Sequence, residues 1–108
     1  MIFDYNKIEE KVIPAFKGGD GEYNVRMCVE GSSKLMNGRL VPGSSIGLHT
    51  HTDDAEAIFV LSGSGKAICD GETERVFPGV CHFCPKGHSH TLINDGKDDL
   101  VFYAAVIG

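Results

Sequence analysis

Short apolar runs separated by polar turns recur along the whole chain, and they predict a protein built almost entirely of β-strands. The runs are rich in β-branched and aromatic residues and end at Gly, Asn, Asp or Pro, which is typical of strands joined by tight turns. Asp70-Gly71 is a hairpin signal of this kind. Residues 6–12 form either a short helix or a loose turn. The predicted strands are 25–30, 35–41, 45–51, 56–61, 65–69, 73–77, 80–84, 90–93 and 100–107.

Regularly spaced strands of this length predict an all-β double-sheet jelly roll or a small barrel. Two of the strands are apolar on both faces. In 56–61, Ile58 and Val60 share a face with Glu56, yet Phe59 and Leu61 on the opposite face are also apolar. A strand with one solvated face alternates apolar and polar residues, so something must cover the second face. We expect the N-terminal segment to cover part of it and a second copy of the chain to cover the rest, in a symmetric homodimer.

The length of 108 residues leaves room for one hydrophobic core. We therefore expect a single domain over 1–108, with residues 1–23 as an N-terminal extension. The net charge is -5 and the basic residues are scattered, which argues against a nucleic-acid partner. The N-terminus does not have the pattern of a signal peptide, and no apolar stretch has the length of a membrane span. These features predict a cytoplasmic protein with no membrane partner.

The four cysteines each lie in an apolar run, where cysteine behaves as a small hydrophobic residue. Cys81 and Cys84 have the spacing of a redox or zinc pair, but they lie inside a predicted strand. Residues three positions apart on a strand point to opposite faces. We therefore expect no functional pair at these two positions.

Three histidines and a glutamate stand in two blocks framed by glycines. His49 and His51 share one face of a predicted strand, because side chains alternate with a period of two. The same alternation predicts that Ile46 and Leu48 point away from them. Glu56 lies on the next strand and His90 on a later one.

We predict that the inward faces of these strands converge and that His49, His51, Glu56 and His90 bind one divalent transition metal. A set of imidazoles with one carboxylate suits Mn, Fe, Co, Ni or Zn better than Mg or Ca.

The two blocks resemble the two motifs of the cupin superfamily, G(x)5HxH(x)3,4E(x)6G and G(x)5PxG(x)2H(x)3N. Every defining position is filled between Gly43 and Asn94, in blocks 43–63 and 79–94. The fifteen residues between the blocks are similar to the spacing in compact single-domain cupins of prokaryotes. The resemblance implies a small double-stranded β-helix, or jelly roll, with a metal near its centre bound by the four residues above. It implies no particular reaction, because cupins include dioxygenases, isomerases, storage proteins and sensors.

Three neutral imidazoles and one carboxylate leave a divalent metal with a net charge near +1. An octahedral metal with four protein ligands keeps two positions for a small bidentate anion. We therefore expect a metal-dependent enzyme that acts on a small oxygenated or anionic metabolite by dioxygenase, isomerase or lyase chemistry. The alternative is a metal-containing cupin that binds or senses a small ligand without turning it over. A complete ligand set argues against a storage module.

An enzyme of this kind needs a group near the metal that can move a proton. Glu56 and Tyr103 are the predicted catalytic residues, and His82 and His88 are further candidates, although a surface position is the expectation for His88. The sequence leaves open which of these side chains face inward.

Arg26 and Arg39 lie in predicted strands, where they either grip a substrate carboxylate or, as we expect, point to solvent. Asp53 and Asp54 are expected to be solvated turn residues.

Overall fold

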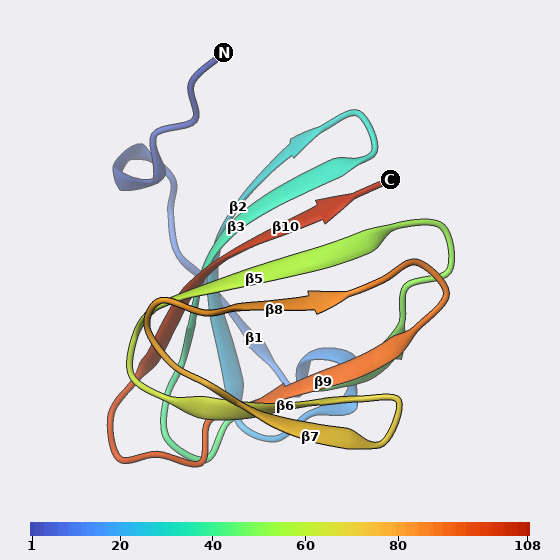
Figure 1. Ribbon diagram of the computed structural model, residues 1–108. Coiled ribbons are helices and arrows are strands. Elements are labelled where there is room, and N and C mark those ends of the chain that lie inside the picture. Colours follow the sequence, from blue (N-terminus) through green and yellow to red (C-terminus); the bar gives the residue numbers. More distant parts are fainter.

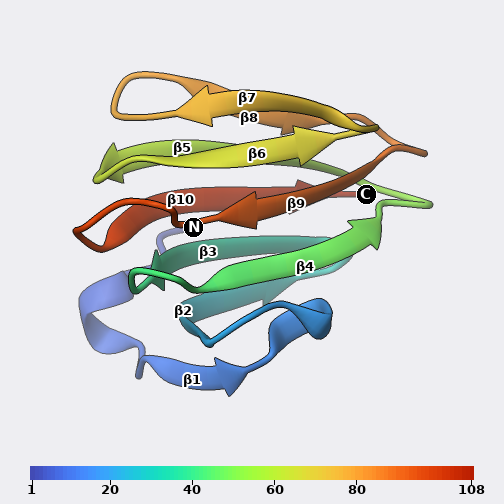
Figure 2. The same cartoon turned by 90° about the horizontal axis from the view of Figure 1, so that it is seen from below.

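Two antiparallel β-sheets lie face to face in the computed structural model, which describes residues 1–108 (Figures 1 and 2). This arrangement confirms the predicted all-β jelly roll. The larger sheet contains, in spatial order, β1 (Lys11–Pro14), β2 (Glu22–Glu30), β3 (Ser33–Leu40), β10 (Leu100–Ile107), β5 (Ala55–Ser62) and β8 (Cys81–Cys84). The smaller sheet contains β4 (Ser45–Thr50), β9 (Ser89–Ile93), β6 (Gly65–Cys69) and β7 (Glu72–Val76).

The N-terminal segment differs most from the prediction. Residues Tyr5–Lys7 form the short 3-10 helix η1, and a second 3-10 turn, η2, spans Phe16–Gly18. Between them, β1 pairs with β2 at the edge of the larger sheet, a strand that the pattern did not predict. Its Pro14 is tolerated because an edge strand has one side free of partners. Neither 3-10 helix has the length or the apolar character needed to cross a membrane.

The core fills the space between the sheets. Alternate residues of β10 face inward, and Leu100 and Phe102 are fully buried, while Tyr103 and Ile107 on the other face are exposed. The same alternation holds in β8, where Cys81 is exposed and Cys84 is buried. The expectation that these two cysteines point to opposite faces is therefore confirmed.

Strand β4 contradicts the simple alternation. The pairing of β4 with β9 shifts between Ile46 and His49, so the strand contains an irregularity there. Ile46 is buried in the core on the same side as His49, whereas Leu48 is 69% exposed. The prediction that Ile46 points away from the histidines is wrong, because a bulge resets the side-chain parity along a strand.

The N-terminal segment is held on the outer face of the larger sheet by two arginines. Arg39 makes two hydrogen bonds to the Glu10 carboxylate, at 2.8 and 3.4 Å, and one to Asp99 at 3.2 Å. Arg26 donates to the carbonyl of Ile8 at 3.1 Å. Both arginines therefore bind groups of their own chain, and neither a substrate-gripping role nor a purely solvated position describes them.

The motif glycines lie where the chain reverses. All four have positive φ, as the turn pattern predicted, namely Gly43, Gly63, Gly79 and Gly87. At Gly63, with φ of +79°, a Cβ atom would also lie 2.2 Å from the Asp99 carbonyl oxygen, so no larger residue fits there.

Candidate metal centre

The four predicted ligands come from three strands and meet between the sheets. β4 carries His49, and His51 follows directly after its last residue, while Glu56 lies on β5 and His90 on β9. The register of β4 and β9 sets His49 opposite His90. Glu56 reaches toward them from the larger sheet. The fold thus joins residues that lie up to 41 positions apart in the chain.

The Nε2 atoms of the three imidazoles are close together. His49 Nε2 lies 3.2 Å from the Nε2 atoms of both His51 and His90, and the last two are 3.0 Å apart. Glu56 Oε1 is 2.9 Å from His90 Nε2, 3.1 Å from His51 Nε2 and 3.9 Å from His49 Nε2. These four side chains form a group that could hold a metal ion.

The opposite nitrogens of His49 and His51 are each engaged by an acceptor. His49 Nδ1 lies 2.7 Å from the Gly47 carbonyl oxygen, and His51 Nδ1 lies 2.6 Å from Asp54 Oδ1. A carbonyl or carboxylate oxygen can only accept, so each neutral ring carries its proton on Nδ1. The Nε2 lone pairs of both rings therefore face the cluster.

His90 is oriented through a second histidine. His90 Nδ1 is 2.9 Å from His82 Nε2, and His82 Nδ1 is 2.5 Å from Glu74 Oε1. His82 is buried, and its ring stacks on that of His90 at 5.2 Å. The Glu74 carboxylate must accept from His82 Nδ1, so His82 Nε2 accepts from His90 Nδ1 in turn. His90 Nε2 is left with its lone pair toward Glu56.

Burial and hydrogen bonding set the charges in the cluster. Burial alone would raise the pKa of Glu56, but the imidazoles of His49 and His90 beside it outweigh that effect and hold the pKa at about 2. Burial lowers the pKa of His90, although Glu56 offsets part of that effect. For His49, burial again lowers the pKa, but the nearby Glu56 carboxylate and the hydrogen bond to the Gly47 carbonyl raise it overall. At neutral pH the cluster therefore contains an ionised carboxylate beside the neutral imidazole of His90.

Three converging lone pairs and a carboxylate oxygen make a concentrated negative spot, which favours a cation at its centre. Two atoms that bind one ion at right angles, with bonds of about 2.1 Å, lie about 3.0 Å apart. Five of the six separations here, from 2.9 to 3.2 Å, match that value. The donor set of nitrogen and oxygen atoms fits a first-row transition metal.

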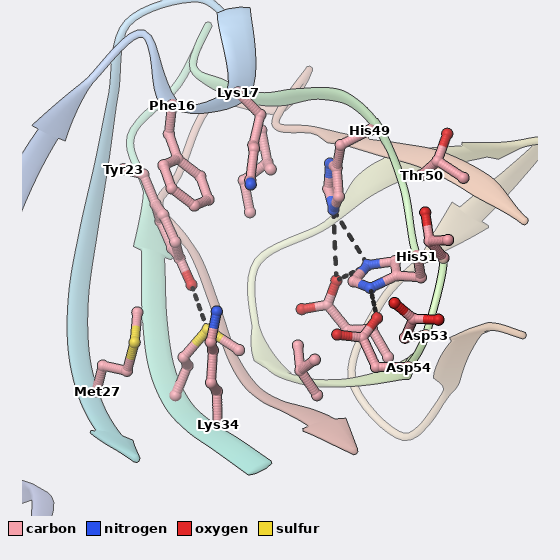
Figure 3. Close-up of a pocket in the computed structure, with 15 residues that line it drawn as sticks. Phe16, Lys17, Tyr23, Met27, Lys34, His49, Thr50, His51, Asp53 and Asp54 are labelled. Atoms are coloured by element: carbon pink, nitrogen blue, oxygen red, sulfur yellow. Dashed lines mark hydrogen bonds and ion pairs between the residues drawn. The ribbon is translucent and has the colours of Figure 1, made fainter. Parts of the chain in front are cut away.

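A cavity of about 420 Å³ opens over the cluster, and His49, His51 and Glu56 form part of its wall. Lys17 from η2 and Lys34 from β3 line the same cavity (Figure 3). Much of the remaining wall is apolar, formed by Phe16, Tyr23, Met27, Met36, Ile46 and Val106. Two cationic side chains therefore share the cavity wall with three carboxylates, those of Asp53, Asp54 and Glu56.

Three of the groups predicted for proton transfer do not line this cavity, and one of them, His82, lies behind His90. Tyr103, predicted as a catalytic residue, lies on the outer face of β10 and stacks on Tyr5 at 5.5 Å. The alternation along β10 turns Phe102 and Ala104 inward and Tyr103 outward, so this prediction is corrected. His88 is exposed and hydrogen-bonded to Asp70, in agreement with the expected surface position.

Several residues of the site had not been singled out for it. Asp54 lines the cavity and holds His51, so it is more than a solvated turn residue. Gly47, Glu74 and the two lysines were not proposed at all. A polar residue three positions after a candidate ligand is a usable signal for Asp54. The Gly47 carbonyl reaches His49 two positions along β4, at the irregularity of that strand. Glu74 and the two lysines depend on strand pairing, sheet packing and the η2 turn, which no local pattern predicted.

Comparison with known proteins adds to this geometry. A family model described as "Cupin domain" matches residues 36–106. The oxalate-binding protein of Thermotoga maritima is 30% identical over 113 residues, which cover 99% of this chain and 93% of that protein.

Solved structures show the same likeness. A crystal structure from Thermotoga maritima, described as a predicted oxalate decarboxylase, has a TM-score of 0.92 at 29% identity and covers 99% of this chain and 98% of that one. The polyketide cyclase RemF of Streptomyces resistomycificus has a TM-score of 0.80 at 22% identity, with 99% of this chain and 78% of that one covered. The second likeness concerns the fold alone.

Proposed function

This chain belongs to the cupin family, and from that premise we propose that it is a metal-dependent cupin that binds a small dianion of the oxalate class. In this proposal His49, His51, Glu56 and His90 hold one divalent ion of Mn, Fe, Co, Ni or Zn. The observation that carries the proposal is the convergence of three Nε2 atoms and one carboxylate oxygen within 3.9 Å at the wall of a cavity.

The ligand class follows from the charges around the proposed metal. An ion bound to three neutral imidazoles and one carboxylate keeps a net positive charge, and it supplies Lewis acidity to a coordinated oxygen. Lys17 and Lys34 add positive charge to the cavity wall. A planar dicarboxylate can offer one oxygen from each carboxylate to the metal and its other oxygens to the lysines. The binding of oxalate by the Thermotoga relative supports this choice.

Turnover of the bound anion is the second candidate, and the chemistry would be of the lyase, isomerase or dioxygenase type. The observation in its favour is that carboxylates line the cavity beside the lysines, namely Glu56, Asp53 and Asp54. Glu56 is the predicted catalytic residue that reaches the site. Asp54 is engaged by His51, and Asp53 is an exposed carboxylate at the cavity wall without such a partner.

Metal content tests the ligand set. Protein purified without added metal should contain about one tightly bound equivalent, and His49→Ala/His51→Ala should lose it, because half of the donor set is gone. Elemental analysis after dialysis measures both. Leu48→Ala is the matched control, since that exposed side chain of β4 points away from the cluster, and it should keep the tight equivalent. Unchanged metal content in the double variant would contradict the site.

Calorimetric titration tests the anion. Oxalate should bind the metal-loaded protein with a Kd in the micromolar to millimolar range, about 4 to 8 kcal/mol, and should bind the apo protein much more weakly. Lys34→Gln should weaken binding, whereas acetate, which lacks the second carboxylate, should bind poorly to every form. Equal affinities of the apo and loaded forms would place the anion elsewhere. Release of formate and CO2 from oxalate would show that the protein also catalyses decarboxylation.

We also propose that the functional unit is a homodimer. Phe59, Leu61, Phe83 and Tyr103 form an outer-face patch on β5, β8 and β10, and each is between 43% and 55% exposed. The register places Tyr103 beside Phe59, so the patch is continuous across strands. Apolar side chains gathered on one sheet face favour burial against an identical face.

A further inference from the structure

A second group of metal-binding side chains lies outside the central cavity. Cys69 is the last residue of β6, Asp70 begins the turn into β7, and His88 precedes β9. Each offers one ligand atom, and these atoms lie within 4.8 Å of one another. None of the three lines the central cavity. We propose that Cys69, Asp70 and His88 form a second metal site, specific for a borderline-soft divalent ion such as Zn²⁺.

The backbone holds these three residues in place before any ion binds. β6 pairs with β9 up to Cys69, and the Asp70 amide continues the contact by donating to the Ser89 carbonyl at 3.1 Å. The Ser89 amide donates to Asp70 Oδ1 at 3.3 Å, which leaves Oδ2 directed to His88 Nδ1. The carboxylate and the imidazole are thus already oriented toward each other.

The charge of the surroundings favours a cation. The three residues lie in a shallow pocket of about 380 Å³, and its other walls are Glu72, Glu74, Phe83 and Pro85. Three carboxylates therefore line the pocket, and no lysine or arginine is among the lining residues. An incoming divalent ion meets an uncompensated negative field here.

The donor chemistry selects the ion. A thiolate, an imidazole and a carboxylate together suit Zn²⁺, which takes four ligands and is often held by three protein groups plus water. Ca²⁺ and Mg²⁺ prefer a shell of oxygen ligands, whereas only one of the three converging side chains, Asp70, offers oxygen. The sulfur donor also distinguishes this site from the central cluster, where every donor is nitrogen or oxygen.

Cobalt spectroscopy separates the two sites. Co²⁺ should give a sulfur-to-metal charge-transfer band with the native protein and equally with His49→Ala/His51→Ala, in which the central cluster is disabled. Zn²⁺ should displace the band. A reductant is needed throughout, because only a reduced Cys69 can offer its sulfur to the ion, and Cys69 is a free cysteine in this structure.

Cys69→Ser should abolish the band, and His88→Gln should weaken Co²⁺ binding at this site by tenfold or more. Asp70→Asn should also weaken it, and Asn tolerates the positive φ of +50° at this position.

Cys81→Ser is the matched control, since Cys81 is an exposed cysteine of β8 outside the group, and the band of this variant should be unchanged. Absence of the band in the native protein, or its persistence in Cys69→Ser, would overturn the proposal. Neither result depends on whether oxalate binds at the central cluster.

Discussion

At the scale of single residues, each histidine of the cluster is oriented by a different acceptor at Nδ1. The acceptors are a backbone carbonyl for His49, a carboxylate for His51 and a second imidazole for His90. Such partners fix the tautomer of a ligand and the direction of its ring, and removing one typically lowers metal affinity 10–100-fold. The direction of the Nε2 lone pairs is therefore set by these acceptors, which are not ligands themselves.

The chain from Glu74 through His82 to His90 gives a testable case. His82→Ala should weaken metal binding about 10–100-fold, because His90 loses the acceptor that keeps its proton on Nδ1. Glu74→Gln should have a smaller effect in the same direction, since a glutamine oxygen still accepts. Competition with a chelator measures both affinities. Glu72→Gln is the control, because Glu72 lies on the same strand without contacting His82, and an equal loss there would argue against the chain.

At the scale of elements, the η2 turn and β4 approach each other so closely that glycine is needed on both sides. A Cβ atom at Gly47 would lie 2.1 Å from the Lys17 carbonyl oxygen, and one at Gly19 would lie 2.2 Å from the Ser45 carbonyl oxygen. Gly47 is also the residue whose carbonyl orients His49. The contact that brings Lys17 to the cavity therefore also sets the direction of a proposed ligand.

Gly47→Ala should consequently affect both stability and metal binding. The backbone atoms that a methyl group would meet cannot rotate away, so we expect a loss of about 1–3 kcal/mol in the free energy of unfolding. Metal affinity should fall as well, because His49 must move with its acceptor. Chemical denaturation and metal titration report the two effects. Leu48→Ala, at the exposed neighbouring position, should change either quantity little, and a harmless Gly47→Ala would refute the close approach.

The link between the N-terminal segment and the larger sheet depends on pH. The hydrogen bond to Arg39 holds the pKa of Glu10 below its usual value. Folding therefore favours the ionised carboxylate, and the stabilisation is present above the ordinary glutamate pKa of about 4.3 and is lost as the pH falls through the lowered value. Glu10→Gln should cost up to about 1 kcal/mol at neutral pH, since the pair is partly exposed.

Urea denaturation of native protein and Glu10→Gln across the acid range measures this difference. The two stability curves should converge at low pH. Glu9→Gln provides the control, because Glu9 is an exposed neighbour, and it should follow the native protein throughout. A gap between native and Glu10→Gln that persists in acid would show that the ion pair is not its source.

At the scale of the whole molecule, the two faces of the larger sheet differ in what covers them. Its inner face forms half of the core and carries Glu56 to the cluster. On its outer face, the N-terminal segment covers part of β2, β3 and β10 through Arg26, Arg39 and the stacking of Tyr5 on Tyr103. The other members of the outer-face patch, Phe59, Leu61 and Phe83, lie beyond that segment and stay exposed in the single chain.

A charge placed in the outer-face patch should dissociate the proposed homodimer. Phe83→Asp or Phe59→Asp would bury a carboxylate without a partner in the contact, so the variant should sediment as a monomer where the native protein is a dimer. Leu48→Asp, which charges an exposed apolar position on the other sheet, should leave the assembly unchanged. A native protein that sediments as a monomer at micromolar concentration would contradict the proposal.

Local patterns in the sequence were sufficient for every strand except β1, for the turn glycines and for the identity of the four residues that meet. Alternation and turn chemistry act over a few neighbouring residues, so they can be read without the fold. They predicted β10 from Leu100 to Ile107 and the opposite orientations of Cys81 and Cys84 correctly. The motif positions then indicated which side chains converge.

The tertiary structure alone decided what surrounds those four residues. A bulge in β4 turned Ile46 inward, and the alternation along β10 turned Tyr103 away from the cavity. Glu74 lies eight positions from His82 along the chain, and their contact joins β7 and β8, which are edge strands of different sheets. The second metal-binding group likewise depends on the pairing of β6 with β9. Strand register and sheet packing depend on residues that are far apart in the sequence, so a pattern of neighbouring residues does not predict them.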